Sequence, residues 1–265
     1  MSLSLFKENV RSGWKMLILF CAIMSLYIYV ISTMYDPNMA SSLAIFAEAM
    51  PELMGAFGMT AVTTTLAGFM ANYLYGFLLV VFPMIFAVMM ANKLVARHVD
   101  RGTMAWLLAS PNGRRKVITA QAVTLLLCML IVVCYVTGLA VAFCQVLFPG
   151  ELEIGAYLTL NLGLFCALLA ISGICFLCSC IFNESKHAVT IGAGIPVFFF
   201  LVQMLVNLGD KLENLKYVTI LTLFNTDGLL SGTGEALMGA AILALLGIAL
   251  YVAGILIFRR RNLPL

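Results

Sequence analysis

Six long apolar runs constrain this chain more than any other feature of its sequence. Each has at least the roughly 20 residues that a helix needs to cross the hydrocarbon core of a bilayer, and none contains Asp, Glu, Lys, Arg or His. The runs are 16–35, 71–92, 117–148, 154–182, 188–208 and 236–258. Only 10% of the residues are charged, against about 25% in soluble domains. We therefore predict an all-α integral membrane protein with six transmembrane helices, forming a single transmembrane domain over residues 1–265.

Lysine and arginine fall almost entirely on one side of the predicted membrane. Thirteen of the 15 lie before the first run, after the sixth, or in the loops that follow the second and fourth runs. Only Lys211 and Lys216 fall on the other side, where most of the acids lie. Because the lysine-rich and arginine-rich side of a membrane protein faces the cytosol, we expect both termini in the cytosol.

The uncharged runs and the missing motifs exclude several function classes. Proton-driven carriers usually need ionisable groups at membrane depth, so the uncharged runs argue against that class. A sodium-driven carrier is less strongly disfavoured, because sodium could still bind carbonyls and hydroxyls. The sequence contains no H-E-x-x-H, G-x-S-x-G or P-loop motif, so we predict no catalytic residue and no nucleotide site in this chain. It also has no basic run interleaved with aromatic residues, which argues against binding to nucleic acid.

The tightest cysteine group is Cys175-x-x-Cys178-x-Cys180, inside the fourth apolar run. Histidines and acids, which a metal site would need nearby, are absent from that run. Cysteine is a small, polarizable side chain that packs well in apolar surroundings. We therefore predict that these cysteines fill space between helices and bind no metal.

Three segments outside the runs have their own patterns. Phe6, Val10 and Trp14 follow Leu3 at helical spacing and form one apolar stripe flanked by basic residues. This predicts an interfacial helix over 1–15 on the inner leaflet, with a plain extension of the first span as the alternative. The segments 36–70 and 209–235 are expected on the external side, and 210–224 within the second is too short to cross the membrane and return as two full spans.

The loop 93–116 is the longest predicted cytosolic segment. Gly102 interrupts the helix that descends from the second span, and Thr103 can cap a new helix. An apolar patch follows, made up of Met104, Trp106, Leu107 and Leu108. Ser110 and Pro111 then end that helix. An exposed apolar patch of this kind requires a partner or the membrane.

This loop also carries the signature of a known family. An acidic residue, glycine and threonine precede a leucine pair, a Ser-Pro pair and an arginine. These residues are Asp100, Gly102, Thr103, Leu107, Leu108, Ser110, Pro111 and Arg114. Between the second and third spans, the pattern resembles the permease subunits of type 2 ABC exporters, and the whole layout is similar to bacterial peptide and drug exporter permeases. His98 departs from the pattern, because many members carry an acid a few residues before the glycine.

The resemblance implies short external or re-entrant helices before the last span. It also implies that the loop forms a coupling helix, which docks in a groove of a separate ATP-binding subunit. It places these residues at that contact: Asp100, Arg101, Gly102, Thr103, Met104, Trp106, Leu107, Leu108, Ser110, Pro111 and Arg114. ATP and Mg are then expected in the partner subunit, and a second permease copy or a similar permease in the membrane. The implied function is ATP-driven export of a hydrophobic or amphipathic cargo, such as a peptide, a lipid-like molecule or a drug, across the bacterial cell membrane.

Other interpretations of the same residues stay open. The loop could be a basic hairpin on the membrane surface that has no protein partner. The chain could be an ion-coupled carrier or channel, although its spans hold nothing to titrate. It could also be a membrane scaffold or sensor whose cytosolic loop recruits a partner.

Overall fold

The computed structural model describes residues 3–35, 50, 55, 65–104, 113–208 and 210–261, and within these ranges it contains helices and no strands. The helices are α1 (Leu3–Met34), α4 (Leu66–Met70), η2 (Ala71–Tyr75), α5 (Leu78–Ala91), η3 (Asn92–Ala96), α6 (Arg97–Asp100), α8 (Arg114–Leu147), α9 (Ile154–Ile181), α10 (Ser185–Val206), η4 (Asp210–Tyr217), η5 (Ile220–Leu223), α11 (Thr226–Leu230) and α12 (Gly234–Arg260). Six helical stretches are long and apolar enough to cross a membrane, which confirms the predicted all-α fold with six spans.

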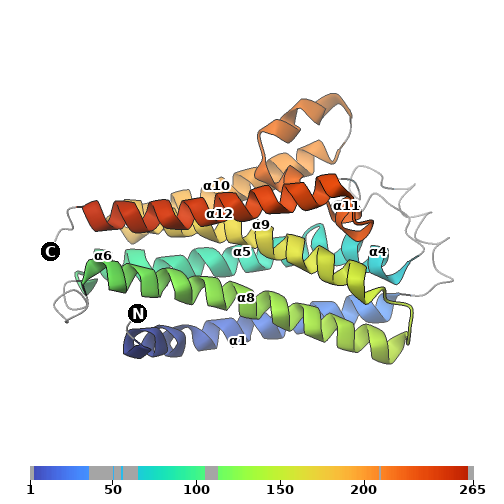
Figure 1. Cartoon of the computed structure of the whole chain (residues 1–265), viewed down its shortest axis with the longest axis horizontal. Coiled ribbons are helices and arrows are strands. Elements are labelled where there is room, and N and C mark those ends of the chain that lie inside the picture. The colour runs from blue at the N-terminus through green and yellow to red at the C-terminus, as the bar shows by residue number, and fades with distance from the viewer. Residues whose placement is uncertain are drawn as a thin grey trace.

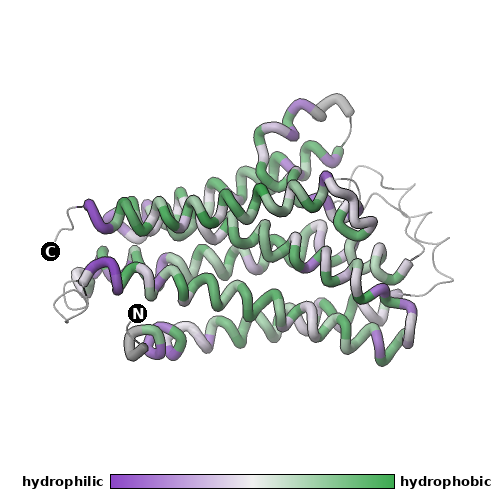
Figure 2. The backbone as a smooth tube through the Cα atoms, in the orientation of Figure 1, coloured by the Kyte–Doolittle hydropathy of each residue, from purple (hydrophilic) through white to green (hydrophobic). Residues whose placement is uncertain are grey.

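The long helices run side by side along one axis, and both termini lie at the same end (Figure 1). The tube in Figure 2 is hydrophobic along its middle and hydrophilic toward its ends. We call the end with α6, the start of α8 and the end of α12 the basic end, because it carries Arg97, Arg101, Arg114 and the arginines 259–261. The opposite end, with the α8–α9 turn and α11, is called the acidic end.

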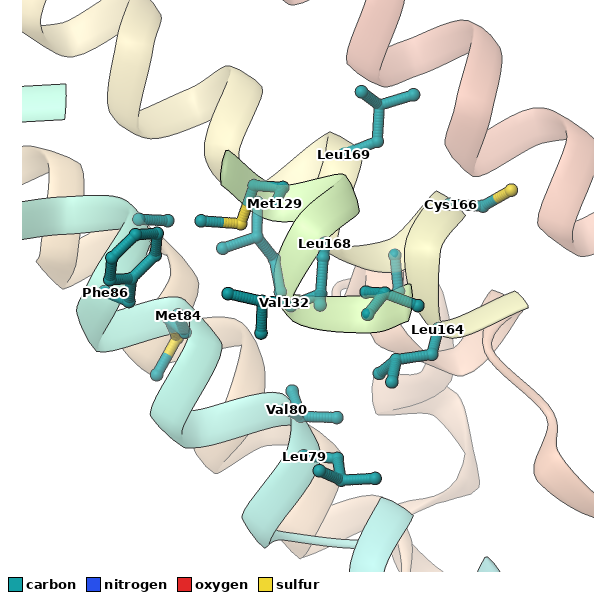
Figure 3. Packing of buried hydrophobic residues seen from close by; sticks show 14 of the residues in the cluster. Leu79, Val80, Met84, Phe86, Met129, Val132, Leu164, Cys166, Leu168 and Leu169 are labelled. Carbon is teal, nitrogen blue, oxygen red and sulfur yellow. The ribbon is translucent and has the colours of Figure 1, made fainter. Parts of the chain in front are cut away.

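Helix α9 is the central element of the bundle. It packs against α5, α8, α10 and α12, and more than half of its residues are buried. Figure 3 shows side chains of α9, among them Leu164 and Leu168, meeting Val80 of α5 and Val132 of α8. The other long helices leave an apolar face exposed, as expected for helices that contact lipid.

Glycines allow α9 and α12 to approach closely. A Cβ atom on Gly247 would lie 2.7 Å from Leu169 Cγ and 2.8 Å from its backbone carbonyl carbon. Close by, the Tyr251 hydroxyl donates a hydrogen bond of 2.9 Å to Ser172 Oγ, and the Tyr251 ring stacks on Phe176 at 5.0 Å. Small residues and hydrogen bonds are the features that associate helices in lipid, where apolar surface alone gives no driving force.

The second predicted span is broken where the sequence predicted one continuous helix. The predicted run 71–92 holds the π-helical turn η2, a turn at Gly76 and Phe77, then α5. Helix α4 precedes it, and η3 and α6 continue α5, so the helix long enough to span is Leu78–Asp100. Phe77 has φ −135° and ψ −61°, which lies outside helical geometry. Glycine has the lowest helix propensity after proline, and π-helical turns occur frequently at functional sites. Hydropathy gave no sign of this break, since the residues on both sides are apolar.

The predicted N-terminal helix forms, but it is continuous with the first span in α1. Val10 and Trp14 are 39% and 48% exposed, so these two residues of the predicted stripe face away from the bundle, whereas Phe6 is half-buried. A neighbouring face of the same helix packs inward, where a Cβ atom on Gly13 would meet Met90 of α5. How this segment lies relative to the membrane surface stays a prediction.

The external segments are described in part. Residues 36–49, 51–54 and 56–64, which include most of the segment 36–70, lie outside the described residues. The segment 209–235 contains the short helices η4, η5 and α11. This confirms the prediction of short helices before the last span.

The α9–α12 contact yields a test with a matched control. Gly247→Ala places a methyl group against the Leu169 backbone, which cannot move aside as a side chain can. We expect the melting temperature of the detergent-purified protein to fall, consistent with an overpacking cost of about 1–3 kcal/mol. Gly138→Ala, in α8 with nothing within 4 Å of the added Cβ, should leave the melting temperature unchanged or raise it. Equal melting temperatures for the two variants would contradict the close contact.

Candidate functional site

The N-terminal half of the predicted coupling loop begins with a glycine-dependent chain reversal. The amide of Arg101 donates to Arg97 O at 3.2 Å and that of Gly102 to Val99 O at 3.1 Å, which ends α6. Gly102 has φ +67°, a left-handed conformation that costs a residue with a side chain about 1–2 kcal/mol. The glycine of the motif is therefore the residue that turns the chain out of the second span.

Thr103 and His98 close this turn. The Thr103 hydroxyl lies 2.9 Å from His98 Nδ1 and 3.3 Å from His98 O. Met104 follows and is 1% exposed, so it anchors the chain to the core. His98, the departure from the family pattern, thus holds the threonine of the motif in place.

The centre of the predicted contact falls outside the described residues, which end at Met104 and resume at Gly113. The residues concerned are Trp106, Leu107, Leu108, Ser110 and Pro111. Of the remaining predicted residues, Asp100, Arg101, Gly102 and Thr103 are exposed. The structure therefore places these four side by side at the surface of the basic end.

Arg114, on the far side of the loop, takes part in a hydrogen-bonded cluster that sequence reasoning did not anticipate. Its guanidinium donates to Arg261 O at 3.0 Å. The Arg261 guanidinium in turn donates to Cys180 O at 2.7 Å, to Phe182 O at 3.1 Å and to Asn183 Oδ1. The cluster therefore joins the start of α8, the end of α12 and the end of α9.

The Arg261 side chain satisfies carbonyls that a helix leaves unpaired in its last turn. A cation at this position also interacts favourably with the negative end of the helix dipole. Partial burial lowers the pKa of the Arg261 guanidinium, but the group stays charged because arginine is not deprotonated in proteins. Arg261 is one of three consecutive arginines and differs from the other two only in lying directly after the end of α12. The sequence alone therefore could not indicate which of the three makes these contacts.

Comparison with protein families decides which class of membrane protein this is. The model of the ABC-2 family transporter proteins matches residues 6–263. The chain belongs to this ABC-2 family. A comparison with curated proteins finds no significant match.

Membership identifies the chain as a membrane permease of an ABC transporter. A permease of this family is a membrane transport component and not itself a catalyst. Membership in the family also implies an ATP-binding cassette partner. The match spans the bundle from α1 to the end of α12, including Arg261 and both sides of the 93–116 loop. The coupling residues themselves stay a prediction, since the match covers the chain and not individual contacts.

The cysteines of the ABC-2 permease have packing contacts. Cys175 Sγ lies 3.3 Å from Gly192 O, across the α9–α10 contact, and a Cβ atom on Gly192 would lie 3.4 Å from Cys178 Cβ. Within the described ranges, no group of three or more His, Cys, Asp or Glu side chains could hold a metal ion. These contacts agree with the space-filling role predicted for the cysteines.

The Arg261 cluster predicts a selective effect on the basic end of the permease. Arg261→Ala removes the donors to the end of α9, and we expect it to destabilise that end by about 1–3 kcal/mol. Hydrogen–deuterium exchange in detergent should speed up at residues 180–184. Arg260→Ala, which removes a neighbouring exposed arginine, is the control. If both variants exchange alike, the cluster does not hold this end together.

Proposed function

We propose that this permease is the membrane-spanning half of an ATP-driven exporter for hydrophobic or amphipathic cargo. Two permease chains, identical or similar, would pair with two separate ATP-binding subunits. The family match over residues 6–263 is the observation that carries the proposal. It is supported by the position of α6 and the start of α8, the described flanks of the 93–116 loop, at the basic end beside the start of α1 and the end of α12 (Figure 1). By the positive-inside rule that end faces the cytosol, where ATP is available.

The described flanks of the loop suggest how force from the ATP-binding subunit would enter the bundle. On one side, Met104 is buried and Thr103 is bonded to His98. On the other side, Arg114 is bonded to the end of α12, and Arg261 to the end of α9. A push on residues 105–112 would therefore act on the second span, on α8 and on the α9–α12 pair together. Such coupled movement could alternate the two permeases between inward and outward arrangements.

The uncharged spans favour a hydrophobic or amphipathic organic cargo over an inorganic ion. Among the buried polar groups, Tyr75 is hydrogen-bonded to Asn161 and Tyr251 to Ser172. These two pairs join helices to one another. The six apolar runs carry no ionisable side chain. Transport driven by protons would require such groups. An amphipathic organic cargo moved by ATP fits these spans better.

The coupling hypothesis predicts a separation of ATP hydrolysis from export. Replacing Leu107 and Leu108 together with Asp puts two carboxylates where an apolar contact with the ATP-binding subunit is expected, and burying an unpaired charge costs several kcal/mol. In proteoliposomes with the partner subunit, we expect export per ATP hydrolysed to fall roughly tenfold or more while membrane insertion stays normal. The control replaces both leucines with Ile, which keeps the surface apolar. Undiminished export by the Asp variant would refute this role for the loop.

The partner itself can be identified by gentle-detergent purification of the tagged permease from its host, followed by mass spectrometry. We expect a soluble subunit with a Walker motif at one copy per permease. Recovery of the permease alone would favour an ion-coupled carrier or channel. Recovery with a partner that is not an ATPase would favour a scaffold or sensor.

A further inference from the structure

A cavity of about 280 Å³ lies at the acidic end, between the broken second span, α10 and residues 221–227. Its lining combines aromatic rings with amides and one carboxylate. These residues include Tyr75, Phe200, Phe224, Gln203, Asn207 and Asp227. We propose that this cavity binds an amphipathic organic cation, with its positive group at Asp227 and its apolar part against the rings.

Two of the aromatic walls are held in place by neighbouring side chains. The Tyr75 hydroxyl donates to Asn161 Oδ1 at 2.8 Å, and the Tyr75 ring is perpendicular to Tyr157 at 6.0 Å between centroids. The Phe200 ring packs edge-on to Phe77 at 5.6 Å. A site whose walls are fixed before the ligand arrives loses less entropy on binding.

The polar lining is also organised. The Thr222 hydroxyl lies 3.1 Å from Gln203 Oε1 and 2.9 Å from Lys216 O, so these two acceptors share its one hydrogen. Gln203 Nε2 donates to Asn207 Oδ1 at 3.0 Å. The bond between Gln203 and Asn207 therefore holds the two amides against each other in the cavity wall.

The charge at the cavity is negative. Asp227 lines both this cavity and a second one of about 270 Å³, which Glu151 and Glu153 also line. Among the described residues, no ion pair joins any of these three carboxylates to a base. Unpaired carboxylates raise the local concentration of cations, and aromatic faces attract the same cations through their quadrupoles. The two features together select a positively charged group attached to an apolar body.

The break at Gly76 and Phe77 explains why there is a cavity at this point. Tyr75 and Gly76 line it, so an unbroken helix through the second span would reposition one of its walls. Below the break, the same span continues through α5, η3 and α6 to the 93–116 loop. Identifying the bound cation with the exported cargo rests on the proposed function, whereas binding itself does not.

The test therefore uses the permease alone, in phosphatidylcholine nanodiscs without an ATP-binding subunit. Radiolabelled benzyltrimethylammonium, a quaternary ammonium with one aromatic ring, is the probe, and empty nanodiscs correct for partition into lipid. We expect saturable binding to the wild-type protein. Asp227→Asn, an isosteric change at an exposed residue, should weaken that binding by about tenfold or more. Phe200→Leu should weaken it as well, through loss of an aromatic wall.

Two controls decide where the cation binds. Glu235→Gln removes an exposed carboxylate of the acidic end that lines neither cavity, and it should leave binding unchanged. The double variant Glu151→Gln, Glu153→Gln should reduce binding only modestly, since these residues line only the second cavity. The proposal is overturned by absent binding to the wild type, by equal effects of Asp227→Asn and Glu235→Gln, or by a larger loss in the double variant. None of these outcomes bears on whether the permease couples to an ATPase.

Discussion

The close approach of α9 and α12 supports most of this structure. In a bilayer, burying apolar side chains between helices gains little, because lipid tails are equally apolar. Association therefore depends on backbone contact and on hydrogen bonds between helices. Gly247 provides the contact by admitting the Leu169 backbone, and the bond between Tyr251 and Ser172 adds polar specificity. The Arg261 cluster and the cavity at the acidic end both depend on α9. Arg261 is hydrogen-bonded to the last turn of α9, and Asn161, in the first half of α9, accepts a hydrogen bond from Tyr75 in the cavity wall.

The spans could be predicted because the bilayer imposes a simple requirement of length and hydrophobicity. The fourth was expected over 154–182 and is found at Ile154–Ile181. Features that depend on backbone geometry could not be predicted in the same way. Gly76 and Phe77 lie within an apolar run, where hydropathy does not distinguish a break from a helix. Pro83 would be a more obvious candidate for a break, yet it lies inside α5.

The candidate coupling site was predictable as a motif but not as a set of contacts. Gly102 was expected to interrupt the helix, and its positive φ, which is incompatible with a right-handed helix, is how it does so. Thr103 was expected to cap the next helix, whereas its described hydrogen bonds go back to His98. Arg261 was not anticipated because it is one of three consecutive arginines. Its role arises only when the fold brings the ends of α9 and α12 together.

The unequal lengths of the helices have a consequence for the surrounding lipid. Helix α8 has 34 residues and α10 has 22, which correspond to lengths of about 51 Å and 33 Å at 1.5 Å per residue. A flat hydrocarbon slab of about 30 Å matches α10 but not α8, so α8 must tilt or extend beyond it. A thicker bilayer would change the tilt of α8 more than that of α10. Because Arg114 begins α8, such a change of tilt would move the C-terminal flank of the 93–116 loop. Hydrophobic mismatch would thereby make the permease sensitive to the acyl-chain length of its host membrane.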